Sequence, residues 1–160
     1  MKKLFVIILT LTAFTLFGQD KYALVIGNSN YTNFGTLRNP VNDAADMKSV
    51  LESLGFNVDI VLNASLAQME NATIKLKNRL EEAGNNSYGL FYYAGHGLEM
   101  NGINYLIPAD ANIPDRIFLR DRAFSMQIML DMLNETRNAL NIVVLDACRD
   151  FPAAWAAALP

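Results

Sequence analysis

The sequence predicts an α/β protein in which helices cover both faces of a mostly parallel sheet, giving a three-layer sandwich. Short apolar runs alternate along the chain with segments in which apolar residues recur every three or four positions, the period of a helix. The runs are apolar at nearly every position, as expected for strands that are buried on both faces. With 160 residues, 52% of them hydrophobic, the chain has the length and composition of one globular domain.

The first half of the chain supplies two strands and two helices. The run KYALVIG predicts a strand at 21–27, and FNVDIVL, which alternates, predicts another at 56–62. Asn39 is expected to cap a helix that has Pro40 in its first turn and Gly55 at its end. The apolar face of this helix is expected to comprise Val41, Ala45, Val50, Leu51 and Leu54. A second helix is expected to begin at Ser65, with Leu66, Met69, Thr73, Leu76 and Leu80 on its apolar face.

The second half supplies two more strands. YGLFYYA predicts a strand at 88–94, and NIVVLDA predicts one at 141–147. Between them, the pair Asn101 and Gly102 separates two short apolar pieces and is typical of a tight hairpin, which we expect to project as a small flap. Ser125 is expected to cap a helix that runs to about Leu133.

The first 19 residues have the pattern of a secretory signal peptide. Lys2 and Lys3 precede an uncharged stretch that runs from Leu4 to Gly18. The alternative is an uncleaved membrane anchor, but the apolar run is shorter than the roughly 20 residues that a spanning helix needs. We therefore expect a secreted or periplasmic protein that has no membrane contact after cleavage.

The charge balance argues against a nucleic-acid partner. Removal of residues 1–19 takes two lysines from the 13 basic residues and leaves 11 against 16 acidic ones, a net charge of −5. The chain has one histidine and one cysteine, so a zinc site would lack its usual ligand set. We expect no metal and no cofactor.

That histidine and that cysteine each follow a predicted strand. His96 comes after the third strand and Cys148 after the fourth, so both would lie at the carboxyl edge of the sheet if these strands are neighbours. An imidazole beside a thiol lowers the pKa of the thiol and can protonate a leaving amine, which is the chemistry of a cysteine protease. The alternative is structural, because a lone cysteine is often a small core residue and a lone histidine is often only hydrogen-bonded.

Four segments resemble motifs of the caspase-like peptidases, the group that includes metacaspases and paracaspases. KYALVIGNSNY is similar to the first strand and loop of the family, and LRNPVNDAADM to its first helix. FYYAGHG is similar to its histidine motif and VVLDACRD to its cysteine motif. The resemblance covers the large catalytic subunit and implies a caspase-like catalytic domain at 20–150, with 151–160 as an unassigned tail.

The resemblance also implies roles for single residues. Cys148 would be the nucleophile and His96 the general base and acid, and the amides of Gly97 and Cys148 would bind the oxyanion. Asp146 would line the primary specificity pocket together with Asp43. Two carboxylates favour a basic residue, best an arginine, before the scissile bond. For Asp43, an ordinary charge in the first turn of a helix is an equal alternative.

The sequence departs from the family in two places. The segment after the histidine motif has only scattered acids, so calcium dependence is not expected. Family members continue after the cysteine motif into a small subunit, whereas this sequence has twelve residues after Cys148, so the C-terminal strands are expected to be missing. A small-subunit or oligomer partner could then complete the cleft.

Two functions follow as hypotheses. The first is a cysteine endopeptidase that cleaves peptides or proteins after Arg or Lys through a Cys-His dyad and an acyl-enzyme. The second is a non-catalytic or incomplete caspase-like binding or regulatory module. A flavodoxin-like ligand-binding domain is disfavoured, because the glycine spacing in GNSNYTNFG does not match a phosphate loop.

Overall fold

The central layer of the protein is a four-stranded parallel sheet. The computed structural model describes residues 18–147, and its sheet has the strand order β2-β1-β3-β7 with every pair of neighbours parallel. The strands are β1 (Asp20–Gly27), β2 (Asn57–Leu62), β3 (Ser87–Gly95) and β7 (Leu140–Ala147). The four apolar runs of the sequence are therefore the four strands, and the predicted parallel sheet is confirmed.

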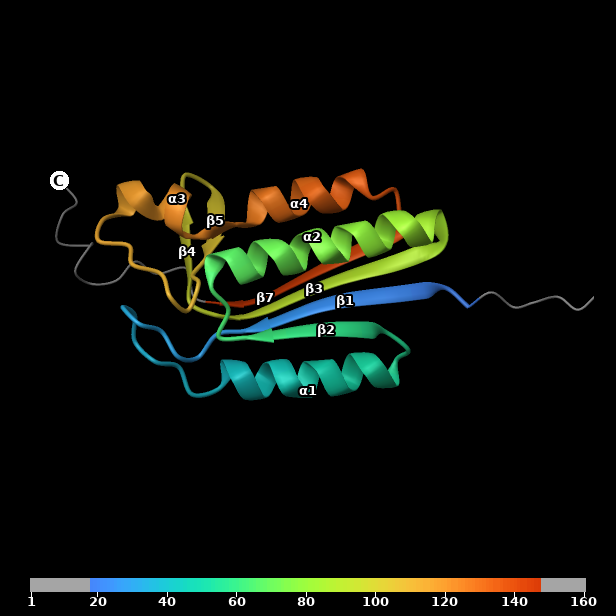
Figure 1. Ribbon diagram of the computed structural model, residues 1–160, viewed down its shortest axis with the longest axis horizontal. Coiled ribbons are helices and arrows are strands. Elements are labelled where there is room, and N and C mark those ends of the chain that lie inside the picture. The colour runs from blue at the N-terminus through green and yellow to red at the C-terminus, as the bar shows by residue number, and fades with distance from the viewer. Residues whose placement is uncertain (1–17, 148–160) are drawn as a thin grey trace, which may run out of the picture.

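Helices cover both faces of this sheet and produce the three layers seen in Figure 1. Helix α1 (Pro40–Ser53) lies on one face, and α2 (Leu66–Ala83) and α4 (Met126–Glu135) lie on the other. Side chains of β3 alternate between the two cores: Phe91 and Tyr93 pack with α2 and α4, whereas Leu90 and Tyr92 pack with α1. The predicted fold class is confirmed.

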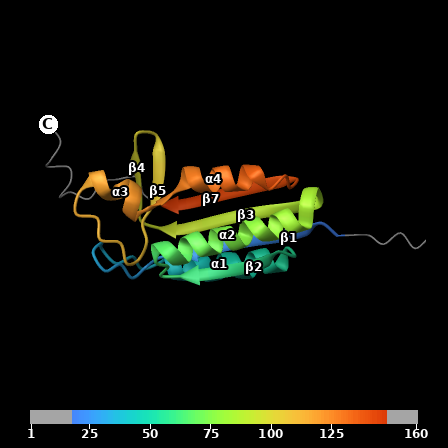
Figure 2. The same ribbon diagram turned by 45° about the horizontal axis from the view of Figure 1, so that its top comes forward.

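The carboxyl end of the sheet carries a smaller antiparallel sheet. Its strands are β4 (Gly97–Met100), β5 (Ile103–Leu106) and β6 (Phe124–Ser125). Asn101 and Gly102 form the predicted turn between β4 and β5, both with positive φ. Figure 2 shows this hairpin projecting from the body of the domain. The short elements η1 (Gly84–Asn86), η2 (Arg116–Phe118) and α3 (Leu119–Arg122) and the strand β6 were not predicted.

The predicted helix boundaries hold, but two details of α1 were wrong. Asn39 occupies the N-cap position without a side-chain cap bond, and the Oγ of Ser29 accepts the N–H of Val41 instead. The buried face consists of Pro40, Ala44 and Leu51, while Val50 and Leu54 are more than half exposed. Helix α1 packs closely on β1 at Gly27, because a Cβ at position 27 would lie 2.7 Å from the Cβ of Ala44. This contact is therefore made by small residues rather than by large apolar ones.

In contrast, α2 follows its prediction closely. Ser65 accepts the backbone N–H of Gln68, whose side chain accepts the N–H of Ser65, so the helix begins with a capping box. Its buried residues are Met69, Thr73, Leu76 and Leu80.

Asn28, directly after β1, joins three segments at the carboxyl end of the sheet. Its side chain is fully buried and accepts the N–H of Ala64 at 2.8 Å, while its Nδ2 donates to the carbonyl of Ile107 at 3.1 Å. Its own N–H donates to Ala94 at the end of β3. One amide side chain thus fixes the loops that surround the edge where the predicted site lies.

Several predictions concern residues outside the described range. The signal-peptide prediction falls on 1–17 apart from its last two residues, and Cys148 and the tail at 151–160 also lie outside it. Within residues 18–147, no helix is long and apolar enough to cross a membrane.

Candidate active site

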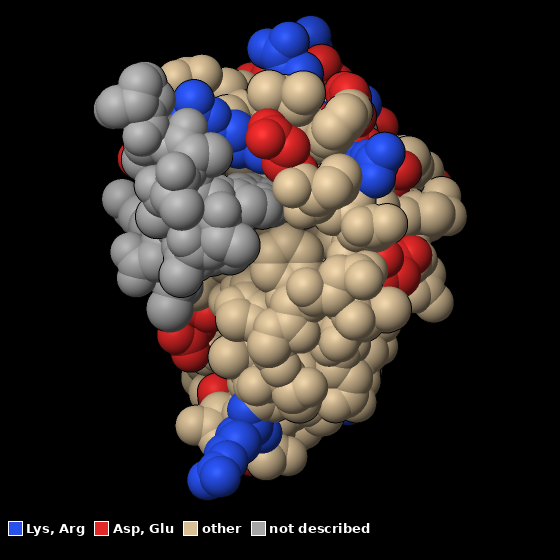
Figure 3. Space-filling view, turned by 90° about the vertical axis from the view of Figure 1, so that its left-hand side faces the viewer, with Lys and Arg blue, Asp and Glu red and all other residues tan. Residues whose placement is uncertain are grey.

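The candidate site lies where β1, β3 and β7 end, which is the face turned toward the viewer in Figure 3. The adjacency on which the predicted Cys-His pair depends is present, because β3 and β7 are parallel neighbours. Their last register pair joins Gly95 to Ala147, and these residues directly precede His96 and Cys148. The two strands therefore deliver the chain to the same edge one residue before each predicted catalytic position.

The imidazole of His96 is held by the loop between β1 and α1. Its Nε2 lies 2.6 Å from the carbonyl oxygen of Gly35. The ring also packs against Tyr31, with 4.6 Å between the ring centroids, and against Phe34, with 6.0 Å. A carbonyl oxygen can only accept a hydrogen bond, so Nε2 carries the proton in the neutral ring and Nδ1 is left as the basic nitrogen.

The main chain of His96 is bonded on both sides by tyrosine hydroxyls. Its N–H donates to the hydroxyl of Tyr31 at 2.8 Å, and its carbonyl accepts the hydroxyl of Tyr93 at 2.8 Å. The two hydroxyls lie 3.3 Å apart. The same carbonyl also accepts the N–H of Ile107, the residue that follows β5.

Gly95 is required by this arrangement. A Cβ at position 95 would lie 2.5 Å from the hydroxyl oxygen of Tyr31 and 2.6 Å from that of Tyr93. Any side chain at this position would therefore displace both phenols.

Gly97 begins β4 opposite Leu106 of β5. The adjacent bond, from the N–H of Ile107 to the carbonyl of His96, makes the pair of Gly97 and Leu106 one of the non-hydrogen-bonded kind. The N–H of Gly97 therefore points away from β5. It is available to a group outside the ladder.

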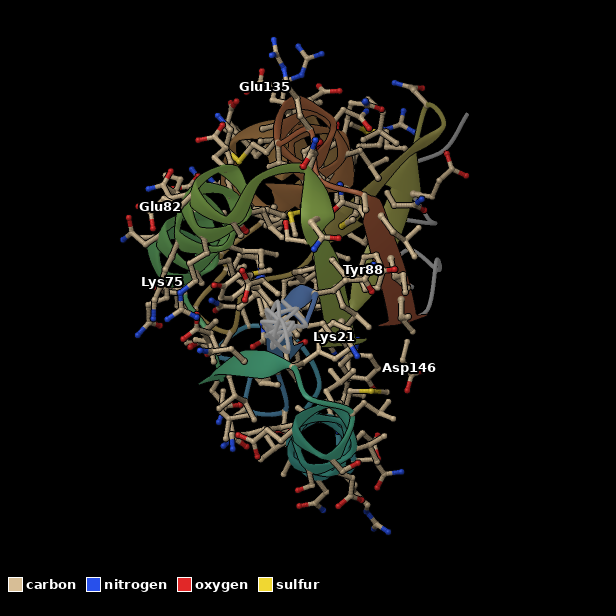
Figure 4. The ribbon with its side chains drawn as sticks, turned by 90° about the vertical axis from the view of Figure 1, so that its right-hand side faces the viewer. Lys21, Lys75, Glu82, Tyr88, Glu135 and Asp146 are labelled. Carbon is tan, nitrogen blue, oxygen red and sulfur yellow. The ribbon has the colours of Figure 1, made fainter. Side chains whose placement is uncertain are left out.

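Asp43 and Asp146 line one pocket of about 380 Å³ at this edge. Asp43 is half-buried in the first turn of α1, and Asp146 is exposed near the end of β7. Figure 4 shows Asp146 on the side of the sheet that faces α1. The pocket is lined by Leu37, Arg38, Asn39, Pro40, Asp43, Gly95, Asp146 and Ala147.

Tyr92 lies behind the two carboxylates. It occupies the same face of the sheet as Asp146, and burial raises its pKa, with Asp146 and then Asp43 adding to the shift. Both negative charges therefore act on one phenol, which supports their proximity to each other. Figure 3 shows that most of this face is uncharged, with acidic and basic side chains scattered over it.

Five groups at this edge were not predicted from the sequence. The carbonyl of Gly35 left no signal, because every residue has one. Tyr31, Tyr92 and Tyr93 were part of matched motifs but had been given no role. Arg38 brings a positive charge into the lining of the acidic pocket and was overlooked although it adjoins Asn39.

No group of three or more His, Cys, Asp or Glu side chains able to hold a metal ion occurs in the described part of the chain. The expected absence of a metal stays a prediction, because Cys148 and the other residues beyond 147 lie outside the described range.

Loss of stability in alkali should report on the buried phenol of Tyr93. Burial raises its pKa well above the ordinary value of 10.0, so the folded chain keeps this proton at pH values where the unfolded chain loses it. The stabilisation is complete below about pH 10 and falls as the pH rises further, by about 1.4 kcal/mol per pH unit for one proton. In urea unfolding followed by circular dichroism between about pH 10 and 12, Tyr93→Phe should show the shallower decline. Tyr88→Phe, at the other end of β3, should follow wild type; equal slopes in all three would contradict the assignment.

The structure is thus a three-layer α/β domain that brings a histidine and two carboxylates to the carboxyl edge of a parallel sheet. The family model for the caspase domain matches residues 20–156. The chain belongs to this caspase-like family of cysteine peptidases, as the four sequence motifs had indicated.

Curated relatives agree with this assignment. The chain is 35% identical over 131 residues to the human mucosa-associated lymphoid tissue lymphoma translocation protein 1 and 34% identical to the homologous protein of Mus musculus. Each alignment covers 82% of this chain and 15% of the relative, so the chain spans only a small part of these proteins.

A solved structure shows a similar fold. Protein GSU0716 from Geobacter sulfurreducens is 18% identical and superposes with a TM-score of 0.59, over 84% of this chain and 53% of that one. At this identity the likeness concerns the fold alone.

Proposed function

We propose that the protein is a cysteine endopeptidase that cleaves after Arg or Lys, with Cys148 as nucleophile and His96 as general base and acid. The observation that carries the proposal is the register of β3 and β7, which pairs the residue before His96 with the residue before Cys148. Family membership supports the same class of reaction.

The bond to Gly35 assigns the proton transfers. With the proton of the neutral ring on Nε2, Nδ1 takes the proton of the Cys148 thiol as the sulfur attacks the substrate carbonyl carbon. The tetrahedral intermediate collapses when the imidazolium returns that proton to the leaving amine, which yields an acyl-enzyme. Water, deprotonated by the same Nδ1, then attacks the thioester and releases the acid and the thiol.

The oxyanion would be bound by the amides of Gly97 and Cys148. The outward direction of the Gly97 N–H supports its part in this role. Two such donors stabilise the charge that develops on the carbonyl oxygen, and loss of one typically costs about 10² to 10³ in rate.

Asp43 and Asp146 form the proposed pocket for the basic side chain. A guanidinium can bind a carboxylate through two parallel bonds, which favours arginine over lysine. Arg38 lines the same pocket, so the lining carries two negative charges and one positive charge. Arg38 and Asp146 are both exposed, so water screens both charges, whereas Asp43 is half-buried. The lining keeps an excess of one negative charge, which favours a cationic side chain.

A panel of fluorogenic peptides tests the proposal directly. Peptides that differ only in the residue before the scissile bond, arginine, lysine or aspartate, should be turned over in that order of preference, with no detectable cleavage after aspartate. Cys148→Ala should lose all turnover, since it removes the proposed nucleophile. Turnover that survives in Cys148→Ala, or a preference for aspartate, would exclude this function.

The second candidate is a caspase-like module that is incomplete alone. It is favoured by β7, which pairs only with β3 among the described strands and exposes four apolar side chains: Leu140, Ile142, Val144 and Leu145. An open strand edge with apolar side chains suits a further strand from another chain, such as a small subunit or a second copy. Silence of the folded chain in the peptide panel, with turnover restored by such a partner, would support this candidate.

Export remains part of the proposal. The signal pattern at residues 1–19 would place the mature protein outside the cytoplasm, in the periplasm or the medium. N-terminal sequencing of the mature chain would reveal cleavage near Gly18 or Gln19.

A further inference from the structure

The hydroxyls of Tyr31 and Tyr93 form a closed hydrogen-bond ring with the main chain of His96. Tyr93 donates its single proton to the carbonyl of His96, with Ile107 as a second acceptor at 3.1 Å. Between the two phenols, Tyr31 is therefore the donor and Tyr93 the acceptor. The ring then runs from the N–H of His96 to Tyr31, from Tyr31 to Tyr93, and from Tyr93 back to the carbonyl of His96.

The surroundings keep this ring intact. The side chain of Tyr93 is fully buried and that of Tyr31 is 8% exposed. Burial raises the pKa of both phenols, so both stay protonated over the physiological range and keep their donors. Bonds arranged head to tail strengthen one another, and Gly95 leaves the space in which the two oxygens meet.

The hydrogen-bond ring holds the main chain of His96, the only histidine. The loop between β1 and α1, which carries Tyr31 and Gly35, holds its side chain. Tyr31 bonds the His96 N–H and also packs against the imidazole, while Gly35 accepts Nε2. Each contact restricts a different degree of freedom. The main-chain bonds hold the Cα and the direction of the Cβ, and the Gly35 bond selects the rotation of the ring.

We propose that Tyr31 and Tyr93 are positioning residues that hold His96 in one orientation, with Nε2 on Gly35 and Nδ1 left as the basic nitrogen. The catalytic part of this inference rests on the proposed function, whereas the positioning itself does not. A misplacement of a reacting group by about 1 Å can cost about 10² in rate. Tyr31→Phe and Tyr93→Phe should therefore lower kcat about 10- to 100-fold. KM should stay within about twofold, because neither tyrosine lines the acidic pocket.

The sole histidine permits a test that does not depend on activity. In ¹⁵N-histidine-labelled protein without a histidine tag, His96 is the only source of imidazole signals. At about pH 8.5, where imidazoles are ordinarily neutral, wild type should show one tautomer with Nε2 protonated. Tyr31→Phe keeps the aromatic ring that packs against the imidazole but loses the hydroxyl that accepts the His96 N–H. Its imidazole shifts should therefore be averaged between the two tautomers. Spectra identical to wild type in both phenylalanine variants would overturn the proposal.

A matched control and a double variant separate positioning from general packing. Tyr105 of β5 is 3% exposed, and its hydroxyl makes no hydrogen bond with the residues described, so Tyr105→Phe should leave the histidine signals unchanged. If the two phenols act as one ring, the double variant should be no slower than the slower single variant, whereas independent effects would multiply. Multiplied effects would contradict the ring. If Tyr93→Phe does not fold, Tyr31→Phe alone tests the proposal, because Tyr31 lies nearer the surface than Tyr93.

The outcomes distinguish the two proposals. Altered tautomers in the variants with no turnover in any protein would leave the positioning intact and refute the peptidase. Turnover in wild type with kcat and spectra unchanged in both variants would leave the peptidase intact and refute the positioning.

Discussion

Replacement of His96 by alanine should lower kcat/KM for an arginine peptide by about 10³-fold or more. The variant removes the group proposed both as the base that accepts the thiol proton and as the acid that protonates the leaving amine. The side chain is only half-buried, so the fold should survive its removal, which circular dichroism can verify.

Alkylation of the single cysteine gives a second measure of the same effect. Thiolates react with iodoacetamide and thiols do not, so near pH 6 the rate reports how far a neighbouring imidazole activates Cys148. His96→Ala should slow this reaction at least about tenfold. Cys148→Ala supplies the blank, because the chain has no other thiol. Equal alkylation rates in wild type and His96→Ala would show that the two side chains do not interact.

Neutralising the acidic pocket should remove the preference for arginine. Asp146→Asn and Asp43→Asn keep the size of each side chain and remove its charge, so each should lower kcat/KM for the arginine peptide about 10²-fold. Citrulline has the shape of arginine without its charge. Wild type should prefer arginine to citrulline by at least about 10², and either variant should reduce this ratio to about ten or less.

Asp46→Asn is the matched control for this experiment. It makes the same change on the same helix, but Asp46 is exposed and outside the lining of the pocket, so its ratio should equal that of wild type. A ratio that falls equally in all three variants would reflect net charge rather than the pocket. An unchanged ratio in Asp43→Asn alone would return that residue to the simpler role of a charge favoured by the helix dipole.

The fold was predictable wherever the sequence pattern is local. Three strands of the parallel sheet are largely continuous apolar runs and β2 alternates, the hairpin depends on the pair Asn101 and Gly102, and α2 begins with the capping box at Ser65. The errors on α1 have non-local causes. Its first turn is capped by Ser29, twelve residues before Val41, and its buried face is chosen by the close approach of Ala44 to Gly27.

The candidate site divides in the same way. His96 was identifiable because the single histidine follows a predicted strand, whereas Asp43 and Asp146 were named only through the family resemblance. The structure brings the two carboxylates into one pocket at the edge where His96 lies. The groups that orient His96 were not identifiable. One is a backbone carbonyl at Gly35, and the others are tyrosines whose sequence context is that of core residues.

The bonds of Asn28 bear on how the carboxyl edge of the sheet responds to salt. The side chain bonds Ala64 and Ile107 and the main-chain N–H of Asn28 bonds Ala94; all of these groups are neutral, and the side chain is shielded from solvent. Added salt therefore leaves this junction unchanged, whereas it screens the exposed carboxylate of Asp146. Under the proposed function, higher ionic strength should therefore weaken the binding of a cationic peptide, while the framework that holds the imidazole keeps its shape.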